Sequence, residues 1–127
     1  MKARAIMTHR VYTISPEASV QEVAQLLSRE HISGAPVIDK EGRIIGIITQ
    51  ADIIGKVDRE GLRVADIMSP EVIAVDEETL VGEVAMLLSK RKIKRVPVMR
   101  NGKMVGIISR ADIVQAVAHG YLVIRDW

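Results

Sequence analysis

Gly-Ile-Ile-Thr-Gln-Ala-Asp at residues 46–52 returns as Gly-Ile-Ile-Ser-Arg-Ala-Asp at residues 106–112. Similarity extends outward from both stretches: Ile-Met-Thr at residues 6–8 matches Ile-Met-Ser at residues 67–69, and 21 of the 47 aligned positions are identical. A long internal repeat of this kind marks one supersecondary unit that is used twice. Because duplication of the unit also duplicates any pocket, the best functional candidates are polar residues that recur in both copies.

The composition narrows the class of protein. The chain has 127 residues, of which 48% are hydrophobic and 2% aromatic, so we expect an aliphatic core. It contains no cysteine, which excludes disulfides, thiolate metal sites and thiol catalysis and is compatible with a cytoplasmic location. No apolar run approaches the ~20 residues of a membrane span, and the N-terminus lacks a signal-peptide pattern. A net charge of +2 is weak support for nucleic-acid binding.

Each copy reads as strand, helix, strand, strand, helix. In the first copy, residues 11–14 form a predicted strand, and Ser19 with Glu22 forms a predicted capping box at the start of a helix. After the hairpin described next, a second helix is predicted, which carries Ile54 and Val57 in the first copy.

The two middle strands of each copy form a predicted hairpin. In the first copy the strands are residues 35–38 and 43–48. In the second copy the turn is Asn101-Gly102, which favours a two-residue turn because both residue types tolerate positive φ. The nearly continuous apolar runs at residues 44–48 and 104–108 indicate strands that are covered on both faces.

Together these elements predict an α+β fold built from two pseudo-symmetric repeats, residues 1–61 and residues 62–127, which form one globular pair. The end of the chain, residues 121–127, lies outside the repeat and carries several apolar side chains. We expect this tail either to fold back or to be buried against another chain.

The seven-residue segments 46–52 and 106–112 have two possible explanations. A hydroxyl residue at the N-cap and an acid three residues later form a capping box, which satisfies free helix amides. The same pattern is typical of a nucleotide pocket, because a helix N-terminus attracts phosphate and a carboxylate can accept hydrogen bonds from two ribose hydroxyls. The two roles are compatible, since the hydroxyl can cap the helix in the empty state and contact a ligand in the bound state.

The repeat resembles a CBS domain, and the chain as a whole resembles a tandem CBS pair. The matching features are Ile-Met-[Thr/Ser] ahead of the first strand, residues 32–37 and 93–98, and Gly-x-x-[Thr/Ser]-x-x-Asp after each hairpin. The resemblance covers about residues 5–118 and implies a pseudo-symmetric sandwich with two clefts. It also implies a non-catalytic regulatory, energy-sensing module that forms a homodimer and binds an adenine nucleotide, most simply AMP, with ADP, ATP and S-adenosylmethionine as alternatives.

The resemblance further implies which residues bind the nucleotide. Cleft A would use the Thr-x-x-Asp of the first copy with positions of the second copy, namely Thr49, Asp52, Ser69, Ile73, Lys94 and Arg95. Cleft B would use the corresponding set, namely Ser109, Asp112, Thr8, Tyr12, Ile32 and Ser33. The two aspartates would hold ribose hydroxyls, and Ile47 and Ile107 would contact the base.

The two implied clefts differ in charge. Lys94 and Arg95 belong to cleft A, where cleft B has Ser33 and Gly34. Phosphate needs a counter-charge, and an arginine can hold it through two parallel hydrogen bonds, so we expect cleft A to bind a phosphorylated adenosine more tightly. The adjoining cations at residues 90–92 are explained by a solvated helix end, and this explanation also stays open for Lys94 and Arg95.

Other functions remain open at the level of sequence. No nucleophile has a base beside it, so we expect no enzyme activity; a relative of the CBS insert of IMP dehydrogenase without its catalytic barrel is an alternative. A nucleic-acid binder that uses residues 90–95 and a purely structural dimer are two more. His9, His31 and His119 do not recur and have no metal-ligand spacing, so we predict no metal and no cofactor apart from the nucleotide ligand.

Overall fold

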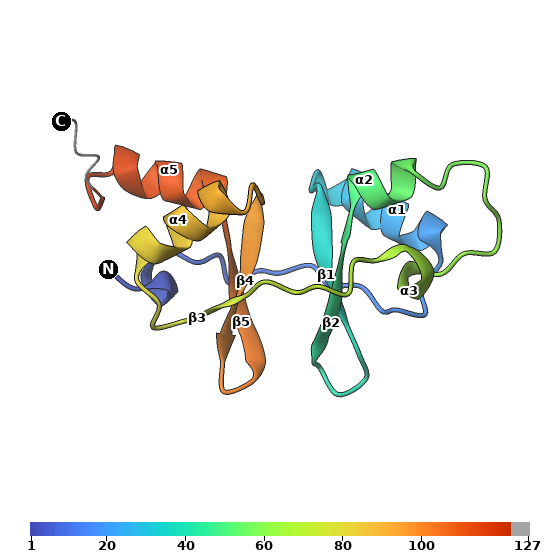
Figure 1. Cartoon of the computed structure of the whole chain (residues 1–127), viewed down its shortest axis with the longest axis horizontal. Helices are drawn as coiled ribbons and strands as arrows, with labels where there is room; N and C mark the ends of the chain where they lie inside the picture. The colour runs from blue at the N-terminus through green and yellow to red at the C-terminus, as the bar shows by residue number, and fades with distance from the viewer. Residues whose placement is uncertain (123–127) are drawn as a thin grey trace. The chain divides into compact units, whose positions relative to one another are not determined.

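The structure, a computed structural model, describes residues 1–122 and divides into two compact units. Unit 2 is Tyr12–Val72, and unit 1 combines Met1–Val11 with the chain from Ile73 onward. The elements of unit 2 are α1 (Val20–Glu30), β1 (Gly34–Ile38), β2 (Ile44–Thr49), α2 (Gln50–Ile54) and α3 (Val64–Ile67) (Figure 1). Those of unit 1 are the 3-10 helix η1 (Ala3–Ala5), β3 (Val75–Asp76), α4 (Val81–Lys90), β4 (Arg95–Arg100), β5 (Lys103–Ser109) and α5 (Arg110–Ala118). Each unit joins helices to one small sheet, which confirms the predicted α+β class.

Both predicted hairpins are present, as the antiparallel pairs β1–β2 and β4–β5. Asn101 and Gly102 adopt φ values of 51° and 79°, the left-handed conformation that a two-residue turn requires. The strand β2 buries Gly46 and Ile48 but leaves Ile47 half-buried. The prediction that these strands are covered on both faces is therefore only half correct.

The predicted strand over residues 11–14 is wrong. Only Ile14 pairs, in an isolated parallel bridge to Val37, whereas the second copy forms the strand β3 beside β4. The difference is explained by a proline in the first copy. Glu77 donates its backbone N–H to β4 at 3.0 Å, and its counterpart in the first copy is Pro16, which has no N–H to donate.

The predicted capping box at the start of α1 is confirmed. The Glu22 N–H donates to Ser19 Oγ, and the Ser19 N–H donates to Glu22 Oε1, both at 3.1 Å. The hydrogen bond from the Ser19 backbone, followed by that from its side chain, lowers the pKa of the Glu22 carboxyl. The second helix of this copy is shorter than predicted, because α2 ends at Ile54 and leaves Val57 beyond it.

The opening segment of each repeat folds into the unit that is built mainly from the other repeat. In unit 1, the Ala3 N–H donates to the carbonyl of Thr79 at 2.7 Å. In unit 2, the Val64 N–H donates to the carbonyl of Ala18 at 2.8 Å. The repeats in the sequence and the compact units in space therefore have different boundaries.

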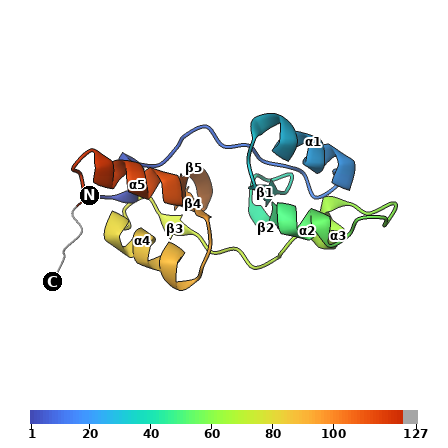
Figure 2. The ribbon, with the colours of Figure 1, turned by 90° about the horizontal axis from the view of Figure 1, so that it is seen from above.

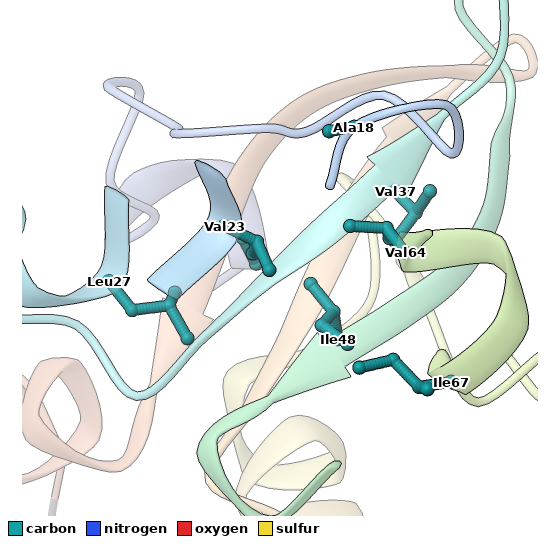
Figure 3. Packing of buried hydrophobic residues seen from close by; sticks show 8 residues of the cluster. Ala18, Val23, Leu27, Val37, Ile48, Val64 and Ile67 are labelled. Carbon is teal, nitrogen blue, oxygen red and sulfur yellow. The ribbon is translucent and has the colours of Figure 1, made fainter. Parts of the chain in front are cut away.

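Aliphatic side chains form a separate core in each unit. In unit 2, Val37 and Ile48 from the hairpin are fully buried in one cluster with Val23 of α1 and Val64 of α3 (Figure 3). The corresponding cluster of unit 1 consists of Ala3, Val84, Leu88, Val96, Val98 and Ile108. Both clusters are aliphatic, as the composition predicts.

The tail beyond α5 is described only at its start. The Tyr121 N–H donates to the carbonyl of Ala116 at 2.9 Å, and the Tyr121 ring meets the ring of His119 edge-on, with centroids 5.8 Å apart. The prediction that the tail folds back or is buried concerns residues 121–127, of which 123–127 lie outside the described residues. None of the helices built from the described part of the chain has the length and apolar character of a membrane span.

Replacing Ala3 with Glu should destabilise unit 1, because Ala3 is fully buried and its apolar neighbours offer no partner to a carboxylate. We expect the free energy of unfolding, measured by chemical denaturation, to fall by about 3 kcal/mol or more. The matched control is Ala5→Glu in the same short helix, which is exposed and should change stability by no more than about 0.5 kcal/mol. Equal stability of the two variants would contradict the role given to the N-terminal segment.

Candidate functional site

Each hairpin strand runs into a helix through a capped junction that carries the recurring Thr/Ser and Asp. In unit 2, the N–H and Oγ1 of Thr49 both donate to Asp52 Oδ2, at 2.8 and 3.1 Å. In unit 1, the N–H and Oγ of Ser109 donate to Asp112 Oδ2 at the same two distances. The capping interpretation of the two seven-residue segments is therefore confirmed, and the cap uses the same single oxygen, Oδ2, of each carboxylate.

A second hydroxyl residue lies beside each junction, brought there by the Ile-Met-[Thr/Ser] segment. Ser69 and Ile47 exchange two backbone hydrogen bonds of 2.9 Å each. Thr8 and Ile107 do the same in unit 1, at 2.8 and 3.0 Å. In unit 1 the hydroxyl also reaches the carboxylate, since Thr8 Oγ1 donates to Asp112 Oδ1 at 3.3 Å. The family resemblance had grouped Ser69 with Thr49 and Asp52, and Thr8 with Ser109 and Asp112, and the structure brings the members of each group together within one unit.

Two glycines make this close approach possible. A Cβ on Gly46 would lie 2.6 Å from Met68 Sδ and 2.8 Å from the carbonyl oxygen of Ser69. A Cβ on Gly106 would lie equally close to Met7 Sδ. These positions are functional candidates that sequence reasoning missed, although glycine and methionine recur together in both copies. Only glycine lets the methionine segment lie against the strand.

The structure distributes the predicted ligand residues over the two units. Unit 2 brings five of them to its junction: Ser33, Ile47, Thr49, Asp52 and Ser69. Unit 1 brings six to its junction: Thr8, Lys94, Arg95, Ile107, Ser109 and Asp112. Ile32 and Ile73 are half-buried and pack against the cores of unit 2 and unit 1, and Tyr12 is half-buried in unit 2. The predicted clefts each combine residues of both units and stay predictions.

The junction of unit 1 is the more basic of the two. Arg95 is partly buried at the start of β4, and this burial lowers the pKa of its guanidinium, which stays protonated near neutral pH. Lys94 is exposed, and its carbonyl accepts from the Arg110 N–H at 3.0 Å, while Arg110 Nε donates to the carbonyl of Ile93 at 2.9 Å. Among the residues that the structure describes, no three His, Asp or Glu side chains gather where they could hold a metal ion.

Comparison with known families identifies the repeat. The family model for the CBS domain matches the chain twice, at residues 3–59 and 64–119. The chain therefore belongs to the CBS-domain family and carries the domain as a pair, which confirms the resemblance inferred from its motifs.

Two solved CBS pairs are similar along nearly their whole length. The CBS domain pair of protein MJ0100, in complex with 5′-methylthioadenosine and S-adenosyl-L-methionine, has a TM-score of 0.85 and 29% identity, covering 94% of this chain and 98% of that one. CBSX2 in complex with AMP has a TM-score of 0.87 and 28% identity, covering 95% and 98%; CBSX2 is a protein of Arabidopsis thaliana.

Relatives of known sequence are longer than this chain. Inosine-5′-monophosphate dehydrogenase of Thermoplasma acidophilum is 32% identical over 114 residues, which are 89% of this chain and 23% of the enzyme. An uncharacterized protein of Methanocaldococcus jannaschii, MJ1232, is 31% identical over 85% of this chain and 36% of its own length. The chain thus spans 23% of the first of these curated relatives and 36% of the second.

Replacing Gly106 with Ala should destabilise unit 1, because the new methyl group would lie 2.6 Å from Met7 Sδ and 3.0 Å from the Thr8 carbonyl oxygen. Overpacking of this kind costs about 1–3 kcal/mol, which thermal unfolding will detect, and Gly46→Ala should behave alike. The control is Gly82→Ala in α4, where nothing lies within 4 Å and stability should rise by up to about 1 kcal/mol. If Gly106→Ala unfolds no earlier than the unchanged protein, the packing argument fails.

Proposed function

We propose that the chain is a non-catalytic regulatory module that binds an adenosine-type nucleotide, with AMP as the first candidate ligand. The observation that carries the proposal is the pair of junction carboxylates, Asp52 and Asp112, each oriented by a cap on one oxygen and flanked by a paired Ile-Met-[Thr/Ser] segment. The solved CBS pairs in complex with AMP and with S-adenosyl-L-methionine support this class of ligand.

Each junction offers groups for the nucleoside part of such a ligand. A carboxylate that is held by its cap can accept hydrogen bonds from vicinal ribose hydroxyls, so Asp52 and Asp112 are assigned to ribose. Ile47 and Ile107 are half-buried and precede the junctions by two residues, so their exposed apolar surface and backbone are assigned to the base. Thr49 and Ser109 supply hydroxyls that can exchange a capping bond for a ligand contact.

The phosphate is assigned by charge. Carried over from the family resemblance, Lys94 and Arg95 would contact the phosphate of the ligand whose ribose is held by Asp52, although within their own unit both lie at the Asp112 junction. The ligand held by Asp112 would meet a neutral group instead, such as Ser33. Hydrogen bonds between charged groups are roughly twice as strong as neutral ones, so a phosphorylated adenosine should prefer Asp52.

Arg95→Ala should weaken AMP binding about tenfold or more, because a hydrogen bond to a charged group contributes about 1.5–3 kcal/mol. Asp52→Ala should weaken binding as well, and it should lower the free energy of unfolding by about 1 kcal/mol because the cap is lost. Titration calorimetry measures the affinity, and denaturation without ligand measures the cap.

The control for the cap is Asp66→Ala. Asp66 caps α3 by accepting from the Arg63 N–H at 2.7 Å, so its loss should lower stability without changing the affinity for AMP. If Arg95→Ala and Asp52→Ala both bind AMP as the unchanged protein does, the assignment is wrong. If only Asp112→Ala abolishes binding, the nucleotide is held by Asp112 and not by Asp52.

The class of ligand is tested by denaturing the purified protein and identifying released small molecules by mass spectrometry. We expect a compound that contains adenosine, and we expect added AMP to bind the refolded or ligand-free protein. Release of a compound without a nucleoside, together with no calorimetric response to AMP, would contradict the proposed function.

We further propose that the module forms a homodimer through helices of unit 1. The helices α4 and α5 lie side by side (Figure 2) and leave Met86 and Val114 exposed, at 69% and 67% of their surface. Two copies of α4 packed antiparallel about Met86 would bring Glu83 of one copy near Lys90 of the other, and both residues are exposed. This opposite charge at a two-fold axis supports a second copy of the chain as the partner.

Met86→Glu should convert the homodimer to a monomer, because it places like charges at the two-fold axis. Light scattering at micromolar concentration should give twice 14.0 kDa for the unchanged protein and 14.0 kDa for the variant. The control is Gln25→Glu, at the corresponding position of the first repeat, which should stay dimeric. An unchanged protein of 14.0 kDa would contradict the homodimer, and a dimeric Met86→Glu would contradict this surface.

A further inference from the structure

The two junctions differ in the use of the second carboxylate oxygen. In unit 1, Thr8 Oγ1 donates to Asp112 Oδ1, while Oδ2 of the same residue accepts the cap. In unit 2, the counterpart of Thr8 is Ser69, and within residues 1–122 no hydrogen bond reaches Oδ1 of Asp52. Asp112 therefore has both oxygens engaged, and Asp52 keeps one oxygen for another donor.

The side chain, not the backbone, makes this difference. Both segments are fixed to the strand by the same two-bond bridge, Thr8 to Ile107 and Ser69 to Ile47, with distances between 2.8 and 3.0 Å. Threonine is branched at Cβ and restricted in χ1, whereas the serine hydroxyl rotates more freely. Holding a hydroxyl over the carboxylate therefore costs less conformational entropy at position 8 than at position 69.

We propose that the Thr8 side chain competes with a ligand for Asp112 and thereby sets the order in which ligand binds at the two junctions. We call the hydrogen bond from Thr8 to Asp112 the latch. The Thr8 hydroxyl occupies one of the two acceptor positions on Asp112 Oδ1. A ribose that donates both of its hydroxyls to this carboxylate therefore competes with Thr8, and this competition weakens binding at Asp112. Asp52 has no such internal competitor and is filled first. The inference rests on the proposed nucleotide-binding function and identifies Thr8 as the residue that makes two duplicated junctions unequal.

The latch can be separated from the charge argument by the choice of ligand. Lys94 and Arg95 favour Asp52 only for ligands that carry phosphate. The latch favours Asp52 for any ligand with ribose hydroxyls, including neutral adenosine. Adenosine is therefore the probe that isolates the contribution of Thr8.

The test is an NMR titration of the full chain with adenosine, in which the Ile47 amide reports one junction and the Ile107 amide the other. Thr8→Val keeps the shape of the side chain and removes the donor, so adenosine should bind about threefold to tenfold more tightly at Ile107 and unchanged at Ile47. Ser69→Thr should have the opposite effect and weaken binding at Ile47. Thr13→Val, at an exposed threonine that makes no such bond, is the matched control and should alter neither site.

Unchanged or weaker binding at Ile107 in Thr8→Val would overturn the latch and make Thr8 a ligand contact or a bystander. Should neither adenosine nor AMP bind to any variant, the proposed function fails, and a measurement without ligand decides on the bond itself. In that measurement Thr8→Val alone should lower the melting temperature, whereas adding Thr8→Val to a protein that already carries Asp112→Ala should not lower it further. Equal shifts in both backgrounds would show that no Thr8–Asp112 interaction exists.

Discussion

Both units depend on the antiparallel bridge between an Ile-Met-[Thr/Ser] segment and the second strand of a hairpin. In unit 2, Ser69 and Ile47 exchange two hydrogen bonds across Gly46, and Met68 occupies the space where a Cβ would stand. This one contact brings a hydroxyl residue to the capped junction and aligns the segment that follows α3. A side chain at Gly46 would separate these features, because its Cβ and the Ser69 carbonyl cannot occupy the same space.

The bridge also explains why the repeat is used as a pair. The segment that closes unit 1 is the opening of the first repeat, and the segment that closes unit 2 is the opening of the second repeat. A chain cut between the repeats, near Gly61, would leave the first piece without Val64 and Ile67, which are buried in its core. Each repeat therefore needs residues from the other before its own core is complete.

Local signals made most of the fold predictable from the sequence. Ser19 with Glu22, and Asn101 with Gly102, act within a few residues, so their caps and turn follow from residue type alone. The prediction of a strand at residues 11–14 was wrong because the pairing of that strand depends on a backbone N–H that Pro16 lacks.

The candidate site was only partly predictable. The recurring aspartates follow from the repeat, and their caps from the spacing to Thr49 and Ser109. The bond from Thr8 to Asp112 joins residues 104 positions apart, so no local pattern reports it. It depends on the register of a backbone bridge, and in the sequence Thr8 and Ser69 are simply two aligned hydroxyl residues. The difference in charge could be predicted from the sequence, whereas the different engagement of the two carboxylates needed the three-dimensional contacts.

The central claim is that the junction carboxylates recognise ribose hydroxyls, and one comparison tests it most directly. The test is titration calorimetry of the unchanged protein with AMP and with 2′,3′-dideoxyadenosine monophosphate. The two ligands differ only in the ribose hydroxyls that would donate hydrogen bonds to Asp52 or Asp112. We predict that AMP binds about tenfold or more tightly than the dideoxy analogue, and that this preference disappears when both aspartates are replaced by alanine. Equal affinity of the unchanged protein for the two nucleotides would contradict the account.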